Sequence, residues 1–308
     1  MKSIKTKTIV QSSLKPMVVA IAMAAALPAH AVRFDIGELE GQFDSSISIG
    51  SSWATASPDK DFIWANSGGN ANAANTDDNR LNFDKGDAFS TIFKGIHDLS
   101  LQYGSTGFFL RGKYWYDFEL KDGHQDLYDI SDDNRKTAAK GSGVQLLDAF
   151  LYHNYSIGDM PGSVRIGKQV VSWGESTFIQ NGINSINPID VAAFRRPGAE
   201  IKEGLIPVNM LYLSQSLTDN LGMEAFYQLE WDQTVIDNCG TFFSPSDTLA
   251  DGCYQVGVGG SQTVPTETRR SSTCHALEMW MPKTRVSLAS PFVTTLNNST
   301  RPNSGCTS

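Results

Sequence analysis

Alternation of apolar and polar side chains is the most constraining feature of this sequence, and it is clearest between Gly107 and Leu120. Successive side chains of a strand point to opposite faces of a sheet. The apolar face of this segment would carry Phe108, Leu110, Gly112, Tyr114, Tyr116, Phe118 and Leu120. The opposite face would carry Phe109, Arg111, Lys113, Trp115, Asp117 and Glu119. The pattern therefore predicts a strand with one apolar face and one charged face.

Six further segments show the same period of two, so we count seven candidate strands. Pro207 cannot donate a ladder hydrogen bond, so the strand that contains it is expected to begin after it. The six segments lie near Phe43–Trp53, Phe93–Tyr103, Val144–Ser156, Ser163–Trp173 and Leu205–Gln215, and from Met223 onward.

The connections between these segments alternate in length. Short turns rich in Gly, Asn and Asp lie at 104–107, 158–162 and 218–222, and longer polar loops lie at 54–85, 121–143 and 174–204. Short turns at one end and long loops at the other are typical of outer-membrane β-barrels. A soluble sandwich would instead bury the apolar faces in a core. The favoured fold class is an all-β, antiparallel transmembrane β-barrel.

The first 31 residues predict export. Lysines at the start, an apolar run from Met17 to Leu27, and Ala29-His30-Ala31 have the pattern of a cleaved secretory signal. The run is shorter than the roughly 20 apolar residues of a membrane span. We therefore predict a signal peptide at 1–31, export by the Sec route, cleavage after Ala31, and a final place in the outer membrane. Outer-membrane lipid and the barrel-insertion machinery are the expected partners.

Composition narrows the remaining classes. The net charge is −8 and no basic patch is present, which argues against nucleic acid as a partner. Gly174-Glu175-Ser176 lacks the second glycine of a hydrolase nucleophile elbow, so no catalytic residue is assigned. No cofactor and no metal site are expected. Asp77-Asp78-Asn79 and Asp132-Asp133-Asn134 have parts of a calcium loop but lack its other ligands, and solvated loop tips are the favoured interpretation.

Two of the four cysteines lie close together in an exported chain. Cys239 and Cys253 flank a polar stretch, so a local disulfide that closes an outer loop is favoured over two free thiols.

The segment from about Gly260 to Ser308 does not share the pattern of the preceding chain, and a disordered tail is one interpretation. A frameshift is another. Met and Trp have single codons, so Met279-Trp280-Met281 and the following proline read Val-Asp-Ala in the neighbouring frame. We predict that residues 260–308 are translated out of frame, and that 32–259 are the front part of the barrel.

Several blocks resemble a known family. They are VRIGKQVVSWGES at 164–176, NGINSINPID at 181–190, RRPGAE at 195–200 and CGTFFS at 239–244. Together they resemble the family known as domain of unknown function 1302, from pseudomonads and related Gram-negative bacteria, over about 32–259. The resemblance implies a large outer-membrane barrel built from a longer chain, and a role linked to hydrophobic or aromatic compounds.

Charged residues on the polar faces are the candidate functional residues. In a barrel they would line the lumen and set the selectivity of a pore. The alternative is that they only pair with one another and stiffen the wall. The loop at 174–204 could fold inward as a constriction, with Arg195 and Arg196 as anion contacts, or it could cap the barrel from outside. The lumen candidates are Arg111, Lys113, Asp117, Glu119, Asp148, Arg165, Glu224 and Glu230.

The favoured function is movement of a small hydrophobic or aromatic molecule across the outer membrane, without enzymatic activity. An outer-membrane lipolytic enzyme and a structural or surface-binding barrel are the alternatives. Single-chain bacterial barrels have an even number of strands, eight or more, so seven strands would leave the sheet open. Unpaired backbone groups at an open edge are costly in lipid. We therefore expect this chain to be a truncated, non-functional fragment that does not insert stably. Heat-modifiable migration of the chain from purified outer membranes would contradict that expectation.

Overall fold

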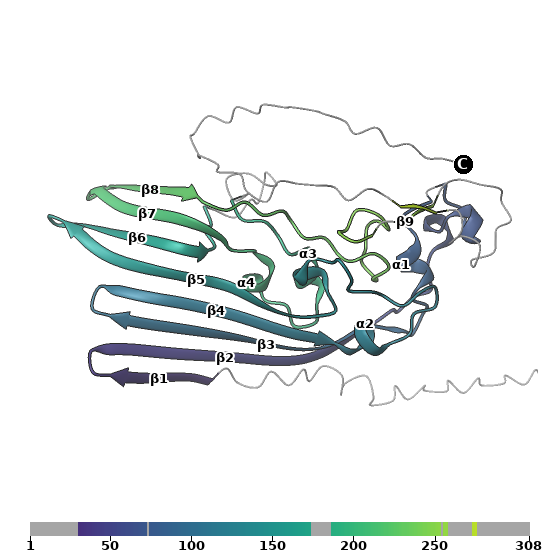
Figure 1. Ribbon diagram of the computed structural model, residues 1–308, viewed down its shortest axis with the longest axis horizontal. Coiled ribbons are helices and arrows are strands. Elements are labelled where there is room, and N and C mark those ends of the chain that lie inside the picture. Colours follow the sequence, from purple (N-terminus) through teal and green to yellow (C-terminus); the bar gives the residue numbers. More distant parts are fainter. Residues whose placement is uncertain (1–29, 73, 174–185, 254, 258–272, 276–308) are drawn as a thin grey trace, which may run out of the picture.

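The eight main strands form one antiparallel sheet in which each strand pairs with its neighbours in the sequence (Figure 1). The structure is a computed structural model that describes residues 30–72, 74–173, 186–253, 255–257 and 273–275. The strands of the sheet are β1 (His30–Ile36), β2 (Leu39–Trp53), β3 (Ala88–Tyr103), β4 (Thr106–Asp117), β5 (Ser142–Ile157), β6 (Met160–Gln169), β7 (Val208–Thr218) and β8 (Leu221–Gln228).

Short and long connections lie at opposite ends of the sheet, as the sequence predicts (Figure 1). The hairpin turns after β1, β3, β5 and β7 gather at one end, and Gly37, Gly104 and Gly158 adopt positive φ angles there. The opposite end carries the long loops. These contain α1 (Asp78–Leu81), α2 (Phe118–Asp122), α3 (Val191–Arg195), α4 (Ile201–Gly204) and short 3₁₀ turns at Lys60–Phe62, Ala65–Ser67 and Thr137–Ala139.

The two faces of the sheet differ as the alternation predicts. On the outer face, large apolar side chains remain exposed, among them Ile49, Leu151, Ile166 and Leu211 at 41–53%. On the inner face, Lys94, Lys113 and Asp117 are buried, as are Ile92 and Met210. In this sheet the apolar face is exposed and the charged face is buried. A water-soluble sheet protein has the opposite arrangement.

Two sequence-based expectations about strands are wrong. The sheet has eight strands rather than seven, because β1 pairs with β2 through the turn at Gly37. It was missed because it is short, although Val32, Phe34 and Ile36 alternate with polar residues. The predicted strand to Leu120 ends at Asp117, because the Asp117 side chain accepts hydrogen bonds from the backbone N–H groups of the next turn and starts α2. The expectation that the strand containing Pro207 begins after it is confirmed, since β7 begins at Val208.

The sheet is open, with β1 and β8 as its two edges. Among the described residues, no helix has the length and apolar character needed to cross a membrane. A second, two-stranded sheet pairs β9 (Gln255–Gly257) with β10 (Thr273–His275). Residues 1–29 of the predicted signal peptide and all of the predicted out-of-frame tail except β10 lie outside the described residues, so both stay predictions. His30 and Ala31, the last two residues of the predicted signal peptide, are the first two residues of β1.

Candidate functional site: a loop held on the inner face of the sheet

Residues 186–207, the longer described part of the connection between β6 and β7, fold back onto the inner face of the sheet. We call this segment the inner loop; it carries α3 and α4, which Figure 1 shows beside the strands rather than beyond their ends. It reaches as far as β2, where a Cβ added to Gly50 would lie only 2.6 Å from Cβ of Pro197. Gly50 therefore leaves the space that the loop needs. The described part of the loop therefore lies on the inner face of the sheet, and its role as a constriction stays a prediction.

Lys94 of β3 anchors one end of α4. Its Nζ donates to Oε1 of Glu203 at 2.6 Å and to the carbonyl oxygen of Gly198 at 2.7 Å. The side chains of this ion pair are only 5% and 3% exposed. Glu203 also accepts from the backbone N–H of Glu200, so one carboxylate both caps α4 and binds the sheet. Lys94 was not among the predicted site residues, although it shares the polar face of β3 with Asp98.

Lys113 of β4 anchors the loop a second time. Its Nζ lies 3.2 Å from Oδ2 of Asp190 and 3.2 Å from the carbonyl oxygen of Glu203. Asp190 uses its other oxygen to accept from the backbone N–H of Ala193, which caps α3. Both ionic side chains are almost fully buried, at 3% and 1% exposed. Removing one partner of a buried ion pair leaves a buried charge without compensation, which costs free energy. These pairs therefore favour the position of the loop in which both partners are in contact.

The two arginines of the inner loop have protein partners of their own. Arg195 donates to Asp237 and to the carbonyl oxygen of Phe243. Arg196 donates to the carbonyl oxygens of Ala138 and Lys140 at 2.7 and 3.2 Å, and its guanidinium group lies over Trp115.

Burial shifts the pKa values of two groups that hold the inner loop, Arg196 and Asp237. It lowers the pKa of Arg196, against the attraction of Asp190 and other carboxylates. Burial likewise raises the pKa of Asp237, and Arg195 opposes that shift. Arg195 and Arg196 thus bind protein groups around the loop, and their role as anion contacts stays a prediction.

Arg111 lies at the centre of a second group of charges on the inner face. It forms two hydrogen bonds of 2.8 Å with the carboxylate of Asp98 and approaches Asp148 at 3.3 Å. Asp98 lies directly opposite Arg111 in the β3–β4 hairpin. This group matches the alternative in which wall charges pair with one another.

The remaining lumen candidates fall in different places. Asp117 is buried and accepts from Ser90, while Glu119 lies in α2, outside the strand that was predicted to hold it. Burial raises the pKa of Glu119. Glu230 lies beyond the end of β8, where it accepts from the side-chain amide of Asn209. The structure therefore keeps Asp117 on the inner face of β4 with Arg111 and Lys113, but it does not unite Glu119 and Glu230 with them.

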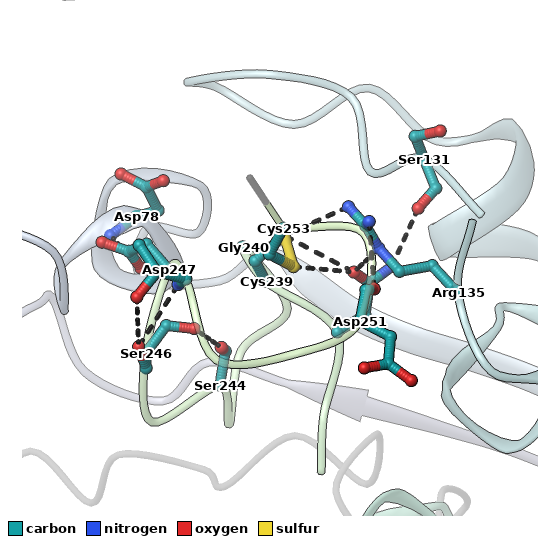
Figure 2. Close-up of a disulfide and its surroundings, with 12 residues drawn as sticks. Asp78, Ser131, Arg135, Cys239, Gly240, Ser244, Ser246, Asp247, Asp251 and Cys253 are labelled. Atoms are coloured by element: carbon teal, nitrogen blue, oxygen red, sulfur yellow. Dashed lines mark hydrogen bonds between the residues drawn. A yellow bond between two sulfur atoms is a disulfide. The ribbon is translucent and has the colours of Figure 1, made fainter. Parts of the chain in front are cut away.

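A disulfide closes the loop that follows β8. Cys239 and Cys253 are bonded, which confirms the predicted pairing, and both are buried. We call residues 236–253 the disulfide loop. Figure 2 shows Arg135 beside the bridge, where it donates to Sγ of Cys239 at 3.2 Å and to the carbonyl oxygen of Asp251 at 3.2 Å. Because Asp237 and Phe243 bind Arg195, this loop also holds the inner loop.

The same disulfide loop brings Asp247 to the start of α1. Its carboxylate accepts from the backbone N–H groups of Asp77 and Asp78 at 3.2 and 3.3 Å. One carboxylate oxygen from each of the three aspartates lies within 4.8 Å of the others, a group that could hold a metal ion. Asp77 is fully buried and Asn79 nearly so, so the interpretation of this stretch as a solvated loop tip is wrong. The prediction that the chain binds no metal stays a prediction.

Tyr128 completes the surroundings of this acidic group. Its hydroxyl donates to Oδ2 of Asp78 at 3.0 Å. Burial, followed by the charge of Asp78, raises the pKa of the Tyr128 hydroxyl, so the group stays a donor. The other predicted loop tip is partly engaged as well, since Asp132 pairs with Lys121 at 2.9 Å.

A comparison with protein families bears directly on this arrangement. The family model described as "Protein of unknown function (DUF1302)" matches residues 14–305. The chain belongs to this family. The DUF1302 match includes all eight strands, the inner loop and the disulfide loop, and it extends over most of the segment predicted to be out of frame. No curated protein matches the chain. No solved structure matches it either.

Proposed function

We propose that the sheet is part of the wall of an outer-membrane β-barrel, and that a small hydrophobic or aromatic molecule crosses the membrane through this barrel. The observation that carries the proposal is the reversed sheet, whose apolar outer face is exposed and whose charged inner face is covered by a loop. In a barrel, the outer face contacts lipid and the inner face lines the lumen. Export by the signal peptide, insertion by the barrel machinery and absence of catalysis belong to the same proposal.

The inner loop supports a barrel wider than eight strands. A closed eight-stranded barrel has an interior just wide enough for side chains. Here the backbone of the inner loop, with two helical turns, lies against the inner face. Eight is an even number, so the argument from an odd strand count no longer holds. The space that the loop occupies still supports a sheet that is not closed by these strands alone. We propose that β1 and β8 pair with strands beyond the eight described here.

In this function the inner loop is the constriction. Its acidic residues Asp190, Glu200 and Glu203 are balanced by Arg195, Arg196 and Lys202, so the loop can lie in the lumen without an excess charge of its own. Lys113 and Lys94 pair with two of these carboxylates from the sheet. Transport would then depend on how far the loop narrows the passage. Inward-folded loops that set the width of a barrel are consistent with the design of outer-membrane channels.

Contact between the outer face and lipid is tested by Leu211→Arg. Leu211 points outward from β7 and is 41% exposed. If it faces the bilayer, the substitution costs about 2–4 kcal/mol near the midplane, and less folded protein reaches the outer-membrane fraction. Asp219→Arg, in the turn between β7 and β8, is the matched control and should insert normally. Equal insertion and stability of both variants would contradict the membrane wall.

Transport is tested by single-channel conductance of the purified protein in planar bilayers. We expect discrete conductance steps, and uptake of small aromatic compounds by vesicles that contain the protein. Weakening the inner loop with Lys94→Met should enlarge the steps, because the buried pair with Glu203 holds the loop on the wall. If the protein shows neither conductance nor uptake, the transport proposal fails.

A further inference from the structure

Arg165 of β6 is a cation surrounded by aromatic rings on the inner face of the sheet. Its guanidinium carbon lies 4.1 Å from the ring centre of Tyr212 and 5.8 Å from that of Phe150. Tyr152 and Tyr212 are its direct neighbours across the two flanking strands. Stacking on aromatic faces orients a guanidinium group while leaving its N–H donors free to bind an anion in its plane.

Arg165 differs from the other inner-face cations in having no ion pair. Lys94, Lys113 and Arg111 each pair with a carboxylate, whereas within the described part of the chain no carboxylate lies within 4.0 Å of Arg165. The carboxylate of Glu224 comes into this neighbourhood, where it accepts from Nε1 of Trp173 at 2.6 Å and hydrogen-bonds with the Tyr212 hydroxyl, and the same hydroxyl hydrogen-bonds with Arg165. Among the described residues, half-buried Arg165 therefore has the Tyr212 hydroxyl as a hydrogen-bond partner but no carboxylate in ion-pair contact.

An open hollow begins next to Arg165. In the register of the sheet, the inner-face row that follows Arg165, Tyr152 and Tyr212 consists of Ser163, Asn154 and Ser214. These three residues line a hollow of about 600 Å³, whose other lining residues include Ser156 and Ser216. A volume of this size suits a small molecule. The hollow is polar, so the aromatic surface available to a ligand is on the side of Arg165.

We propose that Arg165 and its aromatic neighbours form a binding site for a small carboxylate with an aromatic or apolar body. The carboxylate pairs with guanidinium N–H groups other than the one that binds the Tyr212 hydroxyl, and the body packs against the rings of Phe150 and Tyr152. This inference rests on the proposed function, because it takes the inner face as the side that a transported molecule meets. It adds a charge to the substrate class, since a neutral hydrophobic molecule would leave Arg165 unpaired.

Ligand binding to the full chain, purified in a neutral detergent, tests the site. The probes are naphthoate and its neutral analogue naphthalenemethanol, titrated calorimetrically at neutral pH against protein and against empty micelles. We expect naphthoate to bind at least tenfold more tightly than the alcohol, the effect of a hydrogen-bonded charge pair. Arg165→Gln should remove this difference. Lys168→Gln changes a cation on the opposite face of the same strand and should leave it intact.

A second variant covers the case in which Arg165→Gln does not fold. Tyr152→Ser removes one of the two rings against which the ligand body packs, so it should weaken naphthoate binding while the charge of Arg165 remains. The site is refuted if the two probes bind equally to the unaltered chain, or if a folded Arg165→Gln variant keeps its preference for naphthoate. Conductance without naphthoate binding would refute this site alone. Naphthoate binding without conductance would refute the transport proposal and leave the site standing.

Discussion

The Lys113→Met variant is expected to lose about 3–5 kcal/mol of folding stability, because it leaves a buried carboxylate without its cation. Asp190 is only 1% exposed, and the ammonium group of Lys113 is its ion-pair partner at 3.2 Å. Without that partner, the carboxylate gains by leaving the inner face for water. The inner loop should therefore come off the sheet and become open to protease. Urea unfolding and limited proteolysis of the purified chain measure the two effects.

Two matched variants separate the ion pair from a general effect of the substitution. Lys113→Met with Asp190→Asn removes both charges and keeps an oxygen that can cap α3 at Ala193, so most of the stability should return. Lys121→Met breaks a more exposed pair, with Asp132, and should cost about 0–1 kcal/mol. If Lys113→Met is as stable as Lys121→Met, the buried pair does not hold the inner loop.

The faces of the strands were predictable because their signal is local. A period of two assigns each residue of a strand to a face, and it places Lys113 and Asp148 correctly on the buried side. The partner of Arg111 was also within reach. A tight turn after Tyr103 fixes the register of its hairpin, and counting outward from that turn sets Asp98 opposite Arg111.

Contacts that cross from one loop to another had no such signal. Asp190 lies 77 residues from Lys113 along the chain, and Asp247 lies 170 residues from Asp77. Neither pair is linked by a repeat or by a hairpin register, so the sequence could indicate the residues but not their meeting. Glu119 was misplaced for the opposite reason. The alternation continues past Asp117 by composition, and the capping bonds that end the strand override it.

Removing the disulfide should loosen the outer end of the site. In the Cys239→Ser/Cys253→Ser variant, the closed loop of about 15 residues gains conformational freedom in the unfolded chain, which costs about 3 kcal/mol of stability. The disulfide loop supplies Asp237 to Arg195 and Asp247 to the start of α1, so both contacts should weaken together. The readouts are thermal unfolding and proteolysis within 236–253, and the inner loop should also become more sensitive.

The disulfide is buried, so treatment with a reductant is a control for the double-serine variant. Cys239 and Cys253 are 6% and 4% exposed, so a reductant should act on the native protein only after local opening and much faster after unfolding. Reductant should have no further effect on the double-serine variant. Cys306→Ser leaves the bridge intact and should unfold like the unaltered chain. The double-serine variant could instead keep its stability and the contact between Arg195 and Asp237. In that case the disulfide loop does not hold the inner loop, and Lys94 of β3 and Lys113 of β4 are sufficient to do so.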